Sequence, residues 1–462
     1  MDTAAPDLTT PTPPEALASP PPPVSFAEAF RFWLKLGLIS FGGPAGQIAI
    51  MHTELVERRR WISEKRFLHA LNYCMLLPGP EAQQLATYIG WLMHRTRGGI
   101  VAGALFVLPS LAILIALSWV YMRFGDVPAI AGIFYGIKPA VTALVLHAAH
   151  RIGTRALRNG WMWGIAAASF VAIFAFDAPF PALVLGAALV GYFGAKWAPG
   201  VFALGGGHAS RQTHYGPALI DDATPTPPHA RFARTHLVKI LAAGLGLWLA
   251  AMALLVALFG WQGTVTQMGW FFTKAALLTF GGAYAVLPYV YQGAVEHYQW
   301  LTPVQMIDGL ALGETTPGPL IMVVAFVAFV GGWLKQVFGP EALFAGGALA
   351  AMAVTFFTFL PSFVFILAGG PLIEATHGKL GFTAPLSAIT AAVVGVILNL
   401  AMFFAYHVLW PQGFSGHFDV LSALVVLASM VALFRFKVGV MPLLGACAAF
   451  GLVVASLPPG WR

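Results

Sequence analysis

Charged residues are scarce in this chain. Only 9% of its 462 residues are Asp, Glu, Lys or Arg, and 58% are hydrophobic. Soluble domains carry about 25% charged residues, so this composition excludes an ordinary soluble domain. The formal net charge of +7 does not indicate nucleic acid binding, because the basic residues lie in short stretches between apolar runs. In such positions they act as topology signals.

Cysteine is nearly absent as well. Cys74 and Cys447 each lie in an apolar stretch, where a buried thiol behaves as a small hydrophobe. The sequence contains no Cys-x-x-Cys pair and no His-Glu-x-x-His motif, so a structural zinc site or a metalloprotease site has no support. His147 and His150 have no further ligand nearby. We therefore expect neither a metal nor a cofactor.

Long apolar runs fill most of the chain. Each is near the roughly 20 residues that a helix needs to cross a bilayer. The 50 glycines and 33 prolines suit packed and broken membrane helices rather than a β-barrel, whose strands alternate in short segments. The sequence therefore predicts an all-α polytopic membrane protein. Examples of the runs are 98–122, 161–176, 237–259, 343–369 and 418–434.

One signature occurs twice, separated by 239 positions. Its first part is Phe-Gly-Gly and its second part is Pro-Gly-Pro. A duplicated apolar unit with Gly/Pro-interrupted segments at corresponding places is typical of transporters that bind between their repeats. The matched pairs at this separation are Phe41-Gly42-Gly43 with Phe280-Gly281-Gly282, Pro78-Gly79-Pro80 with Pro317-Gly318-Pro319, Lys35 with Lys274, and Trp61 with Trp300.

The repeat divides the chain into two halves of about six apolar segments each. The Pro-rich start does not have the basic residues and apolar core of a signal peptide, so we expect a disordered tail there. The predicted layout is a tail (1–24), a first membrane repeat (25–197), a polar linker (198–236), an extra transmembrane helix (237–260) and a second membrane repeat (261–457).

The extra helix sets the predicted orientation of the second repeat. If each half crosses the bilayer an even number of times, one additional crossing turns the second half upside down, which is a recurrent transporter plan. Beyond the first two segments the separation changes from 239 to 252 positions, as an insertion would produce, so that Leu108-Pro109-Ser110 matches Leu360-Pro361-Ser362. The fold prediction is two inverted-topology repeats.

Basic residues indicate that the first two segments of each half are re-entrant hairpins. Most Lys and Arg clusters are satisfied by a cytoplasmic N-terminus. The cluster from Arg58 to Arg66 would face outward if segments 26–52 and 65–93 each spanned the membrane. It returns to the cytoplasm if the two segments turn near Gly42-Gly43 and near Pro78-Gly79. Full spans remain the alternative.

The Gly and Pro signatures predict an anion site. A helix broken within the membrane frees backbone N–H groups, and the start of the next half-helix offers donors and a positive dipole end. The alternatives are a plain kink, a small-residue helix contact or a tight turn. The predicted substrate-binding residues are Lys35, Ser40, Gly42, Gly43, Gln47, Pro78, Gly79, Pro80, Lys274, Thr279, Gly281, Gly282, Thr315, Thr316, Pro317, Gly318 and Pro319.

Ionisable residues near the breaks are candidates for charge compensation and proton coupling. Lys35 and Lys274 each lie six residues before a Gly pair, where two cations would suit a dianion; snorkelling to the interface is the alternative. A carboxylate that binds a proton as the anion leaves would couple the two fluxes, although a charge at a helix start need have no such role. The proton-coupling candidates are Glu81, Glu314, His69 and Asp308. The role of Lys138, opposite Thr390, stays open.

These motifs resemble a known family. The stretch from Phe41 to Ala49, the Arg run before Trp61 and the first Pro-Gly-Pro resemble the first domain of the chromate ion transporter (CHR) family. Residues 280–288 and 313–319 resemble its second domain, with Ala283 in place of Pro44. The resemblance, from about residue 26 to 456, implies a bacterial inner-membrane carrier that exports chromate and confers chromate resistance. It implies that the proton-motive force drives transport. It also implies a relation to sulfate, a dianion similar in shape to chromate.

Three other interpretations stay open at this stage. A carrier for sulfate or another oxyanion fits the same residues. A membrane enzyme would need clustered acidic or His residues at one interface, which the sequence does not offer. A structural scaffold leaves the duplicated breaks unexplained. We expect a transporter rather than an enzyme, with an oxyanion and membrane lipid as partners and no nucleic acid. The sequence does not decide between a monomer and a homodimer.

Overall fold

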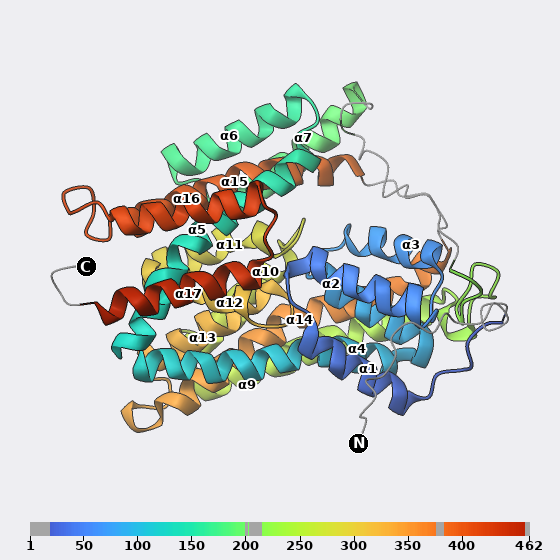
Figure 1. The fold of residues 1–462 in the computed structure, drawn as a ribbon. Coiled ribbons are helices and arrows are strands. Elements are labelled where there is room, and N and C mark those ends of the chain that lie inside the picture. Colours follow the sequence, from blue (N-terminus) through green and yellow to red (C-terminus); the bar gives the residue numbers. More distant parts are fainter. Residues whose placement is uncertain (1–18, 199–201, 203–214, 376–382, 458–462) are drawn as a thin grey trace, which may run out of the picture.

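The computed structural model describes residues 19–198, 202, 215–375 and 383–457 (Figure 1). The tail prediction for residues 1–18 and part of the linker prediction lie outside these ranges. Helices make up the first repeat: α1 (Phe26–Ile39), α2 (Gly43–His52), a π-helical turn (Thr53–Arg58), α3 (Glu64–Cys74), α4 (Glu81–Phe124), α5 (Pro128–Ala156), α6 (Gly160–Phe176) and α7 (Phe180–Trp197).

The second repeat follows α9 (Arg234–Phe259), which is the predicted extra helix. Even the π-helical turn recurs, at 239 positions from its counterpart. The elements are α10 (Thr264–Leu277), α11 (Ala283–Tyr291), the π-helical turn (Gln292–His297), α12 (Pro303–Thr315), α13 (Val323–Leu334), α14 (Leu343–Ala375), α15 (Thr383–Leu409), α16 (Val420–Phe434) and α17 (Val440–Ser456).

The long helices make this chain a polytopic membrane protein. Within the described residues, six helices are long and apolar enough to cross a bilayer, namely α4, α5, α7, α9, α14 and α15. Helix α4 joins two predicted segments, and its backbone is non-helical at His94 and Arg95, where the sequence predicts a boundary. In the second repeat a loop before α14 takes the place of this kink, and this loop accounts for the change in separation.

The first segment of each repeat is a hairpin whose two ends meet. Arg59, beyond α2, forms an ion pair with Glu28 in α1 at 3.7 Å and lies over the Phe32 ring at 4.9 Å. The chain therefore enters through α1, turns at the Gly pair and returns. The ring contact of Phe32 with Trp61, 4.8 Å between centroids, recurs in the second repeat as Phe271 with Trp300 at 5.7 Å. The first segment of each repeat thus turns back on itself, as the hairpin prediction requires.

Helices α4 and α14, which occupy equivalent places in the repeats, run in opposite directions. Near the end of α4, Trp119 contacts Phe344 at the start of α14, with 6.3 Å between ring centroids. Near the start of α4, the Tyr88 hydroxyl donates to Glu374 at the end of α14. In Figure 1, α1 and α3 lie toward one end of this pair, and α12 and α13 toward the other.

The buried residues form two main clusters that do not divide at the repeat boundary. The larger one combines α10 to α13 with α5, α15, α16 and α17. The smaller one holds α1, α2, α3 and the first part of α4, together with the end of α14 and Ile220 of the connection between the repeats. The hairpins of the first repeat therefore pack separately from α5 and α15, whereas those of the second repeat share a core with them.

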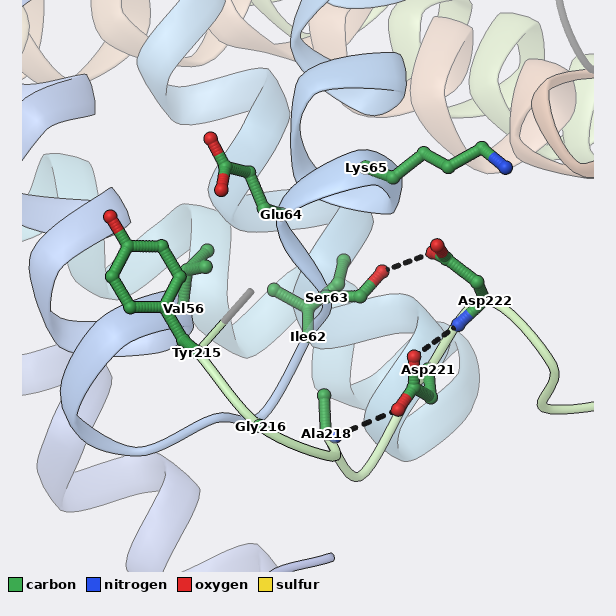
Figure 2. Close-up of a pocket in the computed structure, with 10 residues that line it drawn as sticks. All are labelled: Val56, Ile62, Ser63, Glu64, Lys65, Tyr215, Gly216, Ala218, Asp221 and Asp222. Atoms are coloured by element: carbon green, nitrogen blue, oxygen red, sulfur yellow. Dashed lines mark hydrogen bonds between the residues drawn. The ribbon is translucent and has the colours of Figure 1, made fainter. Parts of the chain in front are cut away.

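The described part of the linker is docked on the open ends of the first-repeat hairpins. Ile220 exchanges backbone hydrogen bonds with Trp61 and Ser63, both at 3.0 Å. Figure 2 shows the Ser63 hydroxyl donating to Asp222 at 2.6 Å beside a small cavity. Nearby, Arg66 donates to the Thr224 carbonyl at 2.6 Å. The connection between the repeats is thus part of the wall at this end of the molecule.

Candidate functional site

The four helix breaks lie where the sequence predicts them. All six of their glycines have φ between +68° and +127°, a range that side-chain-bearing residues rarely adopt. The first break separates α1 from α2 and the second separates α3 from α4; the third and fourth repeat this after α10 and after α12. The Gly and Pro signatures therefore end one helix and start the next.

Two backbone hydrogen bonds join the breaks across the repeats. The N–H of Gly79 donates to the Thr279 carbonyl at 2.8 Å, and the N–H of Gly318 donates to the Ser40 carbonyl at 2.8 Å. Because Gly79 matches Gly318 and Ser40 matches Thr279, the exchange is reciprocal, as in contacts between parts related by a two-fold axis. The second break therefore meets the third, and the fourth break meets the first.

Two glutamine side chains add hydrogen bonds at these breaks, which together are called the junction below. The Gln47 side-chain amide, 1% exposed, donates to the Ser40 and Gly318 carbonyls, so it bridges the first and fourth breaks. The Gln84 amide donates to the Pro78 carbonyl at 2.8 Å. In the part of the chain that the structure describes, the side-chain oxygens of Gln47 and Gln84 are buried without a hydrogen-bond partner. They are acceptors without a donor in a region that otherwise offers backbone N–H groups.

The predicted hydroxyls donate within their own helices. Ser40 donates to the Leu36 carbonyl at 2.6 Å, and Thr279 donates to the Ala275 carbonyl at 2.7 Å. Thr315 and Thr316 likewise donate to carbonyls three residues earlier. These protons stabilise the helix ends beside the breaks, so the donors left for an anion are the backbone N–H groups at helix starts.

The two matched lysines lie differently from each other. Lys35 is exposed on α1. Lys274 is partly buried, and its ammonium group lies over the Trp270 ring at 5.6 Å from the centroid. Their role in charge compensation stays a prediction. The cations whose charge reaches Glu81 at the start of α4 are instead Arg155 and Arg151 of α5.

The two buried carboxylates of α12 each accept from a tyrosine. The Tyr284 hydroxyl donates to Glu314, whose surroundings also include the charge of Arg151. Asp308, 2% exposed in its side chain, forms an ion pair with Lys138 at 3.3 Å and accepts from the Tyr121 hydroxyl at 2.8 Å. Lys138 thus has a partner, which the sequence did not reveal.

His69 and Asp308, which are also separated by 239 positions, make equivalent contacts. The His69 ring lies 3.0 Å from the Ile373 carbonyl in α14, and Asp308 contacts Tyr121 in α4. Tyr121 and Ile373 are themselves separated by 252 positions. Each therefore attaches its hairpin to the long helix of the other repeat.

Some residues at the junction were not predicted from the sequence. A Cβ on Gly318 would lie 2.7 Å from the Ser110 Cβ, and one on Gly79 would lie 3.5 Å from the Ser362 Cβ. Ser110 and Ser362 belong to the matched Leu-Pro-Ser motifs, which was the available signal. Nothing in the sequence pattern pointed to Tyr284 or Arg151.

The cavity in Figure 2 is separate from the breaks. Its volume is about 180 Å³, and it lies between the start of α3 and the docked linker. Three carboxylates, those of Glu64, Asp221 and Asp222, line it beside one lysine, Lys65. This acidic lining does not suit a dianion, so we assign the cavity to the linker contact rather than to the candidate site.

The chain matches a family and individual proteins that are described by chromate transport. The profile of the family described as "Chromate transporter" matches residues 27–192 and 266–452. The chromate transport protein of Pseudomonas aeruginosa is 36% identical over 382 residues, covering 82% of this chain and 80% of that protein. The chromate transport protein of Cupriavidus metallidurans is 28% identical over 458 residues, covering 97% of this chain and 99% of that protein. No solved structure matches.

Proposed function

Because this chain belongs to the chromate transporter family, we propose that it is a secondary transporter that exports chromate from the cytoplasm and so confers chromate resistance. The observation that carries the proposal is the reciprocal pair of hydrogen bonds that joins Gly79 to Thr279 and Gly318 to Ser40. It joins the interrupted helices of one repeat to those of the other in two pairs, and transporters commonly bind substrate between such repeats.

Backbone N–H groups are the proposed anion donors. The first N–H groups of a helix have no acceptor within that helix, and the positive end of the helix dipole lies at the same place. Helices α2, α4 and α11 begin at these breaks, directly after Gly42, Pro80 and Gly282. A tetrahedral dianion held there would exchange part of its hydration shell for these donors.

Glu314 and Glu81 are the proposed proton carriers. Glu314 lies one residue before the fourth break region and is 7% exposed, with the Tyr284 hydroxyl as its donor. Glu81 begins α4 and is partly buried. Export driven by inward proton movement requires the carboxylate to take up a proton as the dianion leaves and to release it before the next dianion binds, so that the proton and the anion bind alternately. This linkage would couple export to the proton-motive force.

The two repeats are proposed to be inverted in the bacterial inner membrane, with the N-terminus in the cytoplasm. The opposite directions of α4 and α14 support this orientation. The open ends of the first-repeat hairpins carry the basic cluster of Arg58 to Arg66, and basic clusters favour the cytoplasmic side. Membrane lipid would surround the exposed apolar faces.

Transport into inverted membrane vesicles tests the function. Radiolabelled chromate should accumulate when a proton gradient, acid inside, is imposed, and an ionophore should abolish the accumulation. Vesicles that never exceed the empty control would remove the chromate-export proposal. Unlabelled sulfate added in excess tests selectivity: sulfate that competes as well as chromate would assign the carrier to oxyanions in general.

A glycine variant connects the transport to the breaks. Gly42 has φ of +87°, so Gly42→Leu should distort the first break and abolish uptake while the protein still reaches the membrane. Gly186→Leu is the matched control, because a Cβ there meets nothing within 4 Å and Gly186 is exposed on α7. Unchanged uptake in the Gly42 variant would separate the breaks from the mechanism.

A further inference from the structure

The hairpins of the two repeats differ in what covers them. Helix α11 packs on α15 and α7, and α12 packs on α5 and α17. Helices α2 and α3 pack on α4, and α3 also on α14. Between described residues, α2 and α3 make no comparable packing against α5, α7 or α15. The contacts of α11 and α12 with these outer helices therefore lack their counterparts.

Exposure at matched positions shows the same difference. Ala45 and Ala49 are exposed on α2, whereas their counterparts Tyr284 and Pro288 are buried on α11. Met75 is 40% exposed, and its counterpart Glu314 is 7% exposed. Sequence alone does not explain this pattern, because small and apolar residues are exposed where larger and charged ones are buried. The hairpin of the first repeat lacks a cover that the other hairpin has.

Two contacts of α15 show what that cover would be. A Cβ on Gly281 would lie 3.8 Å from the Thr390 Oγ1, so the third break touches α15. The rings of Tyr291 and Phe403 lie 4.4 Å apart between centroids. At separations of 239 and 252 positions, the equivalent contacts in the first repeat are Gly42 with Lys138, and His52 with Arg151, both between α2 and α5.

Neither equivalent contact is present in this structure. A Cβ on Gly42 would meet only the Cα of Gly46, at 3.9 Å. Lys138 is paired with Asp308 instead. The His52 ring lies 3.0 Å from Glu57 and packs on Phe67. The four residues that would form these two contacts are thus partly exposed or in contact with other groups.

We propose that the protein has a second state in which α2 docks on α5 as α11 docks on α15 here, which moves Lys138 from Asp308 to the first break. If the repeats exchanged roles, the contacts that α11 makes with α15 and α12 with α5 would be made by α2 with α5 and by α3 with α15. This inference rests on the proposed transport function for its meaning, since it identifies the change that alternates access.

Lys138 gives the second state a distinct chemistry. Its counterpart on α15 is Thr390, which has no charge, so only one of the two states has an ammonium group beside a Gly pair. A compact ammonium charge next to the N–H groups at the start of α2 suits a dianionic oxyanion. Lys138 is therefore a substrate-site residue in the second state and the partner of Asp308 in the first.

Paired cysteines test the exchange without reference to substrate. The two native cysteines are buried, and both are replaced by alanine as background. The first pair, Tyr291→Cys with Phe403→Cys, should cross-link in the state described here. The second pair, His52→Cys with Arg151→Cys, should cross-link only in the second state. Membrane vesicles are treated with a short bifunctional thiol reagent, and the linked peptides are measured by mass spectrometry.

The expected result is an inverse relation between the two cross-links. Chromate and an imposed proton gradient are the two conditions tested. A condition that raises the cross-link of the second pair should lower the cross-link of the first pair at least several-fold. The proposal is overturned if the second pair gives no cross-linked product under any of these conditions while the first pair does. It is also overturned if the same condition raises both products. Cross-links that exchange in a protein that does not carry chromate would refute the proposed function and leave the exchange intact.

Substitution of Lys138 supplies the second measurement. Lys138→Thr, the residue at the matched position, should raise the KM for chromate at least tenfold, and Lys138→Arg should restore most of the affinity because the charge returns. The cross-linking pairs report whether each variant still exchanges. An exchanging Lys138→Thr variant with an unchanged KM would contradict the assigned role.

Discussion

The N–H of Gly318 donates to the carbonyl oxygen of Ser40 at 2.8 Å, across 278 positions of the chain. Its counterpart, from Gly79 to Thr279, has the same length. In each case the donor follows a proline, and the acceptor lies one or two residues after the end of a helix. Backbone groups that leave regular helices within a membrane need partners, and here each repeat supplies partners for the other. The duplicated signatures therefore stabilise one another.

Replacement of Gly318 by alanine should destabilise this junction. Its φ is +101°, and a Cβ would lie 2.7 Å from the Ser110 Cβ. Strain of this kind costs about 1–3 kcal/mol. We expect a lower unfolding temperature in detergent and a loss of uptake. Gly164→Ala is the control, because a Cβ there meets nothing within 4 Å, and it should leave both unchanged. Equal unfolding temperatures for the two variants would contradict this account.

Gln47 should be sensitive to charge more than to size. Its amide nitrogen donates to two carbonyls, those of Ser40 and Gly318. Gln47→Glu sets a carboxylate against these oxygens and removes the side-chain donor of the Gly318 carbonyl, which costs about 1–3 kcal/mol for a buried group. Gln47→Leu removes the donor without adding charge. The thermal unfolding temperature should therefore be highest for the wild type, lower for Gln47→Leu and lowest for Gln47→Glu. The reverse order of the two variants would argue against the bridge.

The ion pair of Lys138 and Asp308 should show strong coupling in a double-mutant cycle. Lys138→Met leaves a carboxylate that is 2% exposed with Tyr121 as its remaining partner, and removal of one partner of a buried pair costs about 3–5 kcal/mol. Lys138→Met combined with Asp308→Asn should recover much of this loss. Denaturation in detergent supplies the four values. Additive losses in the double variant would show that the pair contributes no coupling.

Sequence reasoning located the elements of this fold well because they are encoded locally. Gly-Gly and Pro-Gly-Pro stop and restart helices through their own backbone preferences, so the four breaks could be predicted. The basic cluster from Arg58 to Arg66 favoured hairpins, and the contact of Arg59 with Glu28 agrees. The constant separations identified which positions are equivalent.

The partners of the candidate residues could not be predicted in the same way. Equivalent positions do not reveal whether a residue contacts its own repeat or the other one, and the exchange of Gly79 with Thr279 depends on that choice. Lys35 and Lys274 occupy matched positions, so the sequence did not indicate that Lys35 is exposed while Lys274 is partly buried. The unequal cover of the two hairpins belongs to one state of the protein and not to its sequence pattern.

The inverted orientation of the repeats can be tested at one matched pair of positions. Lys65 and Val304 are 239 positions apart and are both exposed, near the starts of α3 and α12. With the native cysteines buried, Lys65→Cys and Val304→Cys each provide one reactive thiol. If the repeats are inverted, a membrane-impermeant maleimide should label Val304→Cys in intact cells and Lys65→Cys only after permeabilisation. In inverted vesicles the two accessibilities should be exchanged, and labelling of both positions from the same side would exclude inversion while leaving the hairpins and their junction in place.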